Sequence, residues 1–521
     1  MGFFRNWIGY PGQRHTVLHT AKTIDPLDFD AVGEKEPNID IEIRRQDEVG
    51  FNGCKETKMD RGLDFLVWVV GTQFTFWTMW VILIAWAVIG IVFDAPNTWQ
   101  VVMQDAQSIQ TYIWDTLLMR QQLMQSFEQN LIWAEFSSRV ATYRRLLSSP
   151  EYVDSDKLES AEKLESGETK EQKLLSNIDY VESSTVDLPV EGWFDKMSSF
   201  FNQAIGSLPA VIIYWAGIFV WIGCGALESS TGNSPPFTGV TTGSNPERGT
   251  FTNTWQMYIN TATAVVLLIT SVFLQNVRER HDQYVKKTLD EVMHLDYSIE
   301  ARIRTVKKDT EPNLEMALVP EKRTIAVHAI DWYADMIGTG IGVIIAIFVI
   351  VVWLLIGHPM GWNDNWWLII GTYTGLIGFI DGFVLRNVYM RMVNQDESTY
   401  ARCKEEDRVL FNEIGLVFPE EPEVPPATLS YKISVWVNDV CSTTWAVGVS
   451  LLIVLGLLIC ASALRWSEMG QLLCNTPTMI IEGFFLIILM QAHNWADEDV
   501  RKEVHSLFVR RKILYQYVDQ L

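Results

Sequence analysis

One pattern of residues recurs along this chain with constant spacing. In two copies an Asp, a Gly, a Trp and a second Gly lie at identical distances, and an Asn-Thr-Trp-Gln run follows. The two copies are Asp60, Gly71, Trp86, Gly90 and 97–100, and Asp195, Gly206, Trp221, Gly225 and 253–256. A third copy keeps Gly338, Trp353, Gly357 and Trp366, and a weaker fourth runs from Trp436 to His493. Each copy holds two membrane-length segments around a short break, so the repetition predicts an array of helical hairpins.

The apolar segments are long enough to cross a bilayer, which takes about 20 residues each. Apolar residues make up 48% of the chain and 21 of its 521 residues are Trp, which favours a membrane protein. We predict an all-α polytopic membrane protein with about eight transmembrane helices in four repeated hairpins. The odd-numbered spans are predicted at 67–92, 207–227, 336–357 and 442–464, and the even-numbered spans at 99–121, 255–276, 366–388 and 471–493. The first even span is too polar for a hydropathy scan, and only the repeat identifies it.

The repeats and the segments between them define the predicted domains. These are a cytoplasmic tail 1–59, repeat 1 at 60–149, an acidic linker 150–191, repeat 2 at 192–310, repeat 3 at 327–415 and repeat 4 at 430–521. The net charge is -22, and the stretches 25–60 and 150–190 are rich in Asp, Glu, Ser and Lys with few aromatic residues, so we expect them to be mobile. So acidic a chain does not suit nucleic-acid binding. The helical rhythm continues beyond the even spans, as in 277–306 and 497–519, and predicts cytoplasmic amphipathic extensions that include a C-terminal helix.

The distribution of positive charge predicts the orientation. Of the 41 Lys and Arg residues, only Arg248 and Arg465 fall in the loops that join an odd span to the next even span. Positive residues stay on the cytoplasmic side, so we expect both termini to be cytoplasmic. The first residues lack the long apolar core of a cleavable signal.

The even span 99–121 carries a stripe of polar residues. Gln100, Gln104, Gln107, Thr111 and Asp115 recur at steps of four and three, which places them on one face of a helix. A single Asp at the centre of a bilayer costs at least about 2.5–3.5 kcal/mol, so the stripe must face protein or water. A polar line across the membrane indicates the wall of a pathway.

The even spans together offer a ligand set for a divalent metal ion. Carboxylates, amides, a hydroxyl and thioethers suit a partly dehydrated first-row cation. The candidate metal residues are Asp115, Glu482, Asp381, Met119, Gln104, Gln107, Thr111, Met103, Met479, Met490 and His493. Each has a structural alternative: Asp381 can pair with Arg386 and Asp115 with Arg120, the methionines can be packing residues, and His493 can be a residue of a helix end.

Several of these residues also carry a resemblance. Met59-Asp60-Arg61, Trp86-x-x-x-Gly90, Thr98-Trp99-Gln100 and Phe273-Leu274-Gln275-Asn276 with Arg278 resemble the low-affinity iron(II) permease family. Its fungal members look like several fused copies of a two-span unit. The resemblance is strong in the first two copies, moderate in the third and weak in the fourth. It implies low-affinity uptake of Fe(II), and of Cu and Zn, across the plasma membrane. It supplies no ligand motif, so the site residues rest on the physical argument alone.

Other functions remain open at this point. A channel for the same cations is hard to separate from a carrier by sequence. A membrane-embedded metalloenzyme such as a di-iron oxidase needs Glu-x-x-His pairs, and neither His328 nor His493 has a Glu three residues before it. A structural or receptor protein does not need the polar stripe. We therefore expect no enzyme activity and no cofactor, with the metal as the transported substrate, and a homodimer is possible.

Overall fold

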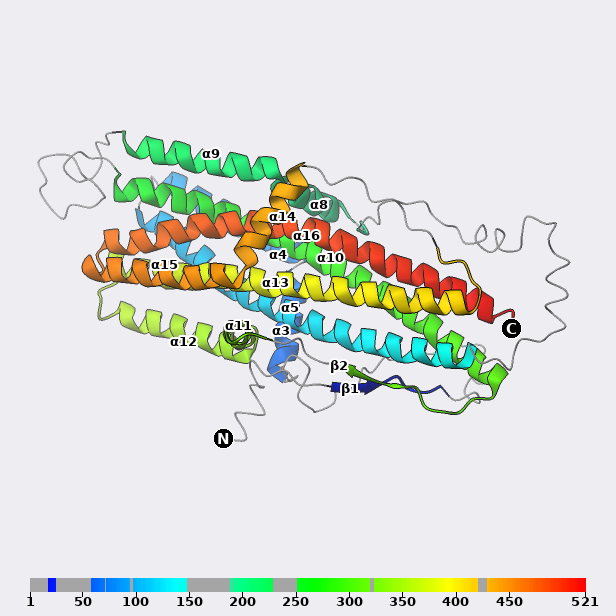
Figure 1. Ribbon diagram of the computed structural model, residues 1–521. Coiled ribbons are helices and arrows are strands. Elements are labelled where there is room, and N and C mark those ends of the chain that lie inside the picture. Colours follow the sequence, from blue (N-terminus) through cyan, green and yellow to red (C-terminus); the bar gives the residue numbers. More distant parts are fainter. Residues whose placement is uncertain are drawn as a thin grey trace, which may run out of the picture.

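The structure is a computed structural model of the chain (Figure 1). It describes residues 17–24, 58–70, 72–93, 97–147, 188–190, 192–227, 251–318, 323–419 and 429–521. The acidic parts of the predicted tail and linker, and most of the loop 228–253, lie outside these residues.

Each repeat consists of three helices in the same order: a short helix, a membrane-length helix and a very long helix. The short helices are α3 (Lys58–Val70), α8 (Trp193–Ile205), α11 (Ile325–Ile337) and α14 (Leu429–Ser442). The odd-numbered spans are α4 (Gln73–Val92), α9 (Leu208–Gly225), α12 (Gly340–Gly357) and α15 (Thr444–Ala463). The long helices are α5 (Asn97–Leu147), α10 (Asn253–Lys307), α13 (Asp364–Glu413) and α16 (Glu468–Val518).

The short helices were not predicted, and they correct two span boundaries. The spans predicted from residues 67 and 336 both break at a corner, because α3 ends at Val70 and α11 ends at Ile337. A Gly followed by a Ser or Thr occupies the corner in the second and third repeats, at 206–207 and 338–339. The Gly allows a close approach of other helices, since a Cβ on Gly206 would lie 2.7 Å from Asn494 Nδ2. The hydroxyl residue begins the next helix; Ser207, for example, accepts a hydrogen bond from the Ala210 amide. In Figure 1, α11 and α14 run across the direction of the long helices, as interfacial amphipathic helices do.

Seven described helices are long and apolar enough to cross a membrane. They are α4, α9, α10, α12, α13, α15 and α16. The molecule is therefore an all-helical membrane protein in its main architecture. As expected for the polar first even span, α5 is not among the seven, although it occupies the same place in its repeat as α10, α13 and α16.

The four long helices form the centre of the molecule. α5 and α16 each pack against both α10 and α13, so the four make a closed bundle. The odd helices lie outside this bundle, with α4 on α10, α9 on α16, α12 on α5 and α13, and α15 on α13 and α16. Their outward faces are exposed apolar side chains such as Ile213, Phe348 and Leu452, which suits contact with lipid tails.

A pair of stacked tryptophans closes each of the first three hairpins. Trp86 stacks on Trp99, Trp221 on Trp255 and Trp353 on Trp366, with ring centroids 3.9, 3.9 and 4.5 Å apart. In every pair each indole N–H donates to the backbone carbonyl of the other residue, at 2.7–3.1 Å. The glycines of the first two copies make room for the rings, since a Cβ on Gly90 would collide with Trp99 and one on Gly225 with Trp255, whereas Gly357 of the third copy faces Trp362. The repeat in the sequence is therefore a repeat of this interhelical clasp.

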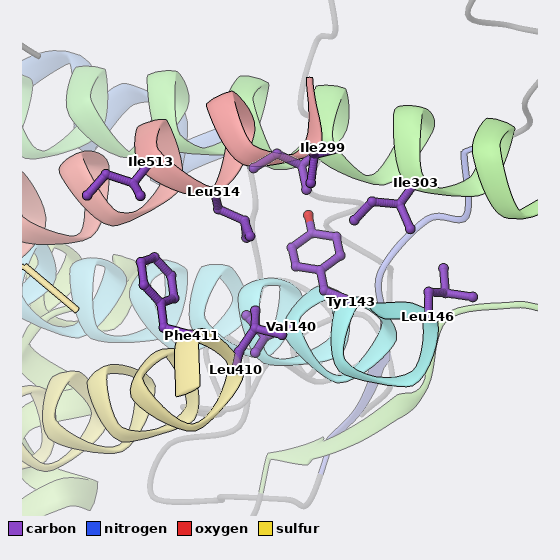
Figure 2. Close-up of a cluster of buried hydrophobic side chains, with 10 residues drawn as sticks. Val140, Tyr143, Leu146, Ile299, Ile303, Leu410, Phe411, Ile513 and Leu514 are labelled. Carbon is purple, nitrogen blue, oxygen red and sulfur yellow. The ribbon is translucent and has the colours of Figure 1, made fainter. Parts of the chain in front are cut away.

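The long helices continue past the odd helices as one extended bundle (Figure 1). With about 1.5 Å of rise per residue, helices of 50–55 residues are roughly 75–80 Å long. This confirms the predicted helical extensions, including the C-terminal helix. Figure 2 shows their core, which Val140, Tyr143, Ile299, Phe411 and Leu514 build from all four helices.

A buried ion-pair network runs through the extensions. Arg511 contacts Asp296 at 2.9 Å and Asp407 at 2.6 Å, and Arg510 contacts Asp407 at 2.8 Å. Burial raises the pKa of Asp296 to about 6, and Arg511 opposes this shift. This network ties α10, α13 and α16 together in the part of the bundle that extends past the odd helices.

A small sheet corrects the purely α-helical prediction. β1 (Val17–Thr20) pairs antiparallel with β2 (Glu315–Leu318), and both strands pack on α5. The Ala21 amide donates to Ser138 Oγ at 3.2 Å, so this part of the predicted tail is held against the extension. Two runs of four residues are too short for a period-two pattern to stand out in the sequence.

Candidate metal pathway

The repeat aligns the four long helices residue by residue. Trp99, Trp255 and Trp366 are equivalent, and Gly470 takes this position in the fourth repeat. Trp255, Trp366 and Gly470 each lie three residues after the N-cap of their helix. We call these four residues the reference positions. Residues that lie the same number of positions after them, one from each long helix, form a level of the bundle. We call the end with the tryptophan clasps the hairpin end and the opposite end the extension end.

A cavity of about 70 Å³ lies inside the bundle, and three levels line it. Twelve residues after the reference position is the upper cavity level, formed by Thr111, Leu267, Gly378 and Glu482. Sixteen residues after it is the lower cavity level, formed by Asp115, Ser271, Gly382 and Leu486. Nineteen residues after it is the leucine level, formed by Leu118, Leu274, Leu385 and Leu489. A water needs about 10–15 Å³ by this measure, so a partly hydrated ion has room.

Two carboxylates predicted from the sequence meet at this cavity. Asp115 on α5 and Glu482 on α16 both line it. They face each other across Gly378 of α13, where an added Cβ would lie 3.8 Å from Asp115 Oδ2 and 3.9 Å from Glu482 Oε2. Two ionised carboxylates this deep in a membrane-length bundle would repel each other, and a bound dication would relieve the repulsion.

The predicted amide and hydroxyl of α5 hold Glu482 in place. Gln107 Nε2 donates to Glu482 Oε1 at 3.3 Å and to Thr111 Oγ1 at 2.6 Å. The Gln107 side-chain oxygen is buried without a hydrogen-bond partner. Gln104, one turn nearer the hairpin end, donates to the Met257 carbonyl at 3.3 Å and to Thr261 Oγ1 at 3.0 Å, which turns its amide toward α10.

Asp381 lies close to the cavity but does not line it. Tyr333 of α11 donates to Asp381 Oδ1 at 2.6 Å, while Asp381 Oδ2 is buried without a hydrogen-bond partner. The alternative pairing of Asp381 with Arg386 does not occur. Arg386 lines the cavity and donates to Asn438 Oδ1 at 3.0 Å and to the Phe485 carbonyl.

The predicted methionines are buried among apolar side chains. Met103 packs with Phe76 and Met79, and Met119 packs with Leu123 and Ala334. Met490 packs with Leu274 and Leu489, and Met479 is buried. None of these four residues lines the cavity. The structure thus places them where the packing alternative expects them.

His493 lies beyond the leucine level, in a separate polar cluster at the extension end. Arg278 contacts its Nε2 at 3.0 Å, and Asp497 Oδ1 lies 3.7 Å from its Nδ1. Nearby, burial lowers the pKa of His281 to about 4 and raises the pKa of Asp282 to about 7. The structure does not bring His493 to the carboxylates of the cavity.

Within the described residues no group of three His, Cys, Asp or Glu side chains is close enough to hold a metal ion. A cation in the cavity would therefore be bound by two carboxylates together with hydroxyl oxygens and water. Such a set is incomplete and hydrated, which suits an ion that must also leave. Sequence reasoning pointed to Ser271 as a polar residue of the second even span, but it did not identify Gly378 or the leucine level, although aligning the even spans position by position exposes both.

Comparison with known proteins agrees with this architecture. A family model described as "Low affinity iron permease" matches residues 247–329, 326–397 and 430–513, which fall in the second, third and fourth repeats. The chain is 47% identical to the low-affinity Fe(2+) transport protein of Saccharomyces cerevisiae, over 100% of this chain and 98% of that protein. It is 39% identical to the low-affinity iron/zinc ion transport protein fet4 of Schizosaccharomyces pombe, over 87% of this chain and 72% of that protein.

No solved structure matches the chain. The full-length identity to the Saccharomyces protein and the repeated matches to the family model agree with the resemblance carried by the tryptophan and glycine motifs. This is a family of permeases and not of enzymes. The chain belongs to the low-affinity iron permease family.

Proposed function

We propose that this protein transports Fe(II) with low affinity across the plasma membrane, through the centre of the four-helix bundle. Zn is a second substrate, as the name of the Schizosaccharomyces relative suggests, and Cu is a third. The observation that carries the pathway is the cavity in which Asp115 and Glu482 face each other across Gly378.

In this proposal α5 is the eighth transmembrane helix. Its polar residues do not need lipid contact, because α10 and α13 pack on both sides of it. The hairpin end faces outward, and the extensions and both termini are cytoplasmic, in keeping with the positive residues of the chain. An inside-negative membrane potential then contributes about 2.3 kcal/mol per charge per 100 mV, so a dication gains roughly twice that on entry.

The test is uptake of radioactive Fe(II) by cells that lack other iron importers and express single variants. Asp115→Asn and Glu482→Gln keep the size of each side chain and remove its charge. We expect each to lower the maximal uptake rate by about ten- to a hundred-fold, the effect of losing about 1.5–3 kcal/mol of charge-assisted binding. Asp290→Asn, on the surface of the α10 extension, is the matched control and should transport as wild type.

Surface expression is measured for every variant, so that a folding defect is not read as a transport defect. Uptake at the wild-type rate in both Asp115→Asn and Glu482→Gln would remove these residues from the pathway.

A further inference from the structure

A second polar level lies between the cavity and the hairpin end. Five residues after the reference position, three of the four long helices carry an amide and the fourth carries a glycine. This amide level consists of Gln104, Asn260, Gly371 and Asn475. All four are buried, and the side-chain oxygens of the three amides have no hydrogen-bond partner. Buried amide oxygens normally find a partner, so three unpartnered ones at one level indicate a site for a ligand or water.

Asp105 adds a negative charge beside this level. It is 4% exposed, and its Oδ2 is buried without a hydrogen-bond partner. The ion pairs found among the described residues do not include Asp105. An ionised carboxylate without a partner is costly at a depth where water is scarce, and a cation would offset that cost.

Gly371 creates the space in which Asp105 and Asn475 approach each other. A Cβ on Gly371 would lie 3.4 Å from Asp105 Oδ1 and 3.4 Å from Asn475 Nδ2. On the next turn of α13, a Cβ on Gly375 would lie 3.1 Å from Asn475 Oδ1 and 2.7 Å from Thr478 Oγ1. Asn475 therefore packs tightly against α13, with its Nδ2 on the side of Asp105. An amide flip, which exchanges the positions of oxygen and nitrogen without changing the shape of the side chain, would turn the oxygen toward Asp105.

The chemistry of this place differs from that of the cavity. It offers one carboxylate with amide oxygens, and neither Asp105 nor any residue of the amide level lines the cavity. Oxygen ligands with a single charge suit a divalent cation that keeps several of its waters. Asp105 and Asp115 are ten residues apart on α5, which corresponds to about 15 Å of helix rise.

We propose that Asp105, with the amide oxygens of Gln104, Asn260 and Asn475, forms a separate dication site on the hairpin side of the cavity. This inference rests on the proposed function, because the ion it binds is the transported cation on its way to Asp115 and Glu482. With one carboxylate it binds the hydrated ion more weakly than a site with two carboxylates. The Asp105 site determines how readily ions enter the pathway at a given concentration, whereas the cavity determines how fast they pass through it.

The uptake assay separates the two sites. For Asp105→Asn we expect the KM for Fe(II) to rise by about tenfold, with the maximal rate within about twofold of wild type, because the variant loses binding at entry. Asp105→Glu keeps the charge and should restore most of the affinity. An unchanged KM in Asp105→Asn would overturn the proposed entry site without affecting the proposed role of Asp115 and Glu482. Absence of Fe(II) uptake by the wild type would instead refute the proposed function.

Metal binding to the purified full-length protein in detergent gives a readout independent of transport and of surface delivery. Free Mn²⁺ is measured by its paramagnetic resonance at millimolar total Mn²⁺. We expect Asp105→Asn and the double variant Asp115→Asn/Glu482→Gln each to lose one bound ion relative to wild type, and Asp290→Asn to lose none. If Asp105→Asn does not yield folded protein, Asn475→Ala replaces it and should weaken Mn²⁺ binding at the same site. Wild-type Mn²⁺ binding by the variant used would contradict the second site.

Discussion

At the scale of single residues, a side chain that is missing matters as much as those that are present. Gly378 leaves open the space into which Asp115 and Glu482 point, and Gly371 does the same beside Asp105. Other glycines of the protein face no neighbour; a Cβ on Gly448 of α15 would have nothing within 4 Å. The two kinds of glycine predict opposite responses to the same substitution.

Gly378→Val places a branched side chain between the two carboxylates. The first methyl carbon fits at ordinary contact distance, so the protein should fold, but the branches fill the cavity. Overpacking of about 1–3 kcal/mol corresponds to a loss of about ten- to a hundred-fold in uptake rate. Gly448→Val, in an odd helix, is the control and should transport normally. Equal uptake by the two variants at equal surface expression would show that ions do not pass Gly378.

Residue-level prediction reached furthest where one helix carries the pattern. The stripe on 99–121 predicts Thr111 and Asp115 on one face, and both line the cavity together with Glu482 of an equivalent helix, while their binding of metal stays a prediction. The roles of the methionines could not be read from spacing, because the side chains that bury Met103 come from α4 and α8. Tyr333, which donates to Asp381, lies on a short helix that the sequence did not reveal.

At the scale of elements, the leucine level closes the cavity toward the extension end. Leu118, Leu274 and Leu385, with Leu489 from α16, present one apolar side chain from each helix. An apolar ring of this kind holds back ions because water does not fill it readily. In the proposed pathway, this level has to open for an ion to pass from the carboxylates toward the extension end.

Leu274→Asn makes the leucine level polar while keeping a side chain with the same branching and number of heavy atoms. We expect the polar side chain to hydrate the closed state and to raise the leak of cations by about tenfold, because one amide lowers the free-energy barrier of the apolar ring by roughly 1–2 kcal/mol. The leak is measured as Mn²⁺ influx or as current at a fixed potential. Leu267→Asn lies on the same helix and lines the same cavity at the upper cavity level, so it should leave the leak unchanged. If both variants leak equally, or neither leaks, the leucine level is not the barrier.

Element boundaries show where sequence reasoning reached its limit. The even helices and their extensions followed from periodicity and agree with the structure to within a few residues at the hairpin end. The short helices α3 and α11 were merged in part into spans, because an apolar run continues through the Gly-Ser/Thr corner. The tryptophan pairs appeared in the sequence only as spacing, since their stacking joins two helices.

At the scale of the whole molecule, four copies of one hairpin enclose a single axis. The apolar odd helices surround the even helices, which lets the most polar of them, α5, stay away from lipid. The extensions hold the four even helices together through an apolar core and the Asp296, Asp407, Arg510 and Arg511 network.

In the proposed mechanism, a dication binds on the axis of this bundle between Asp115 and Glu482. The most direct measurement is an experimental structure of the purified protein soaked with Mn²⁺, with anomalous scattering used to locate the metal. The account predicts an anomalous peak beside Gly378, within coordination distance of both carboxylates, that disappears in the Asp115→Asn/Glu482→Gln double variant. Anomalous density only outside the four-helix bundle, or a cavity peak that persists in the double variant, would contradict it.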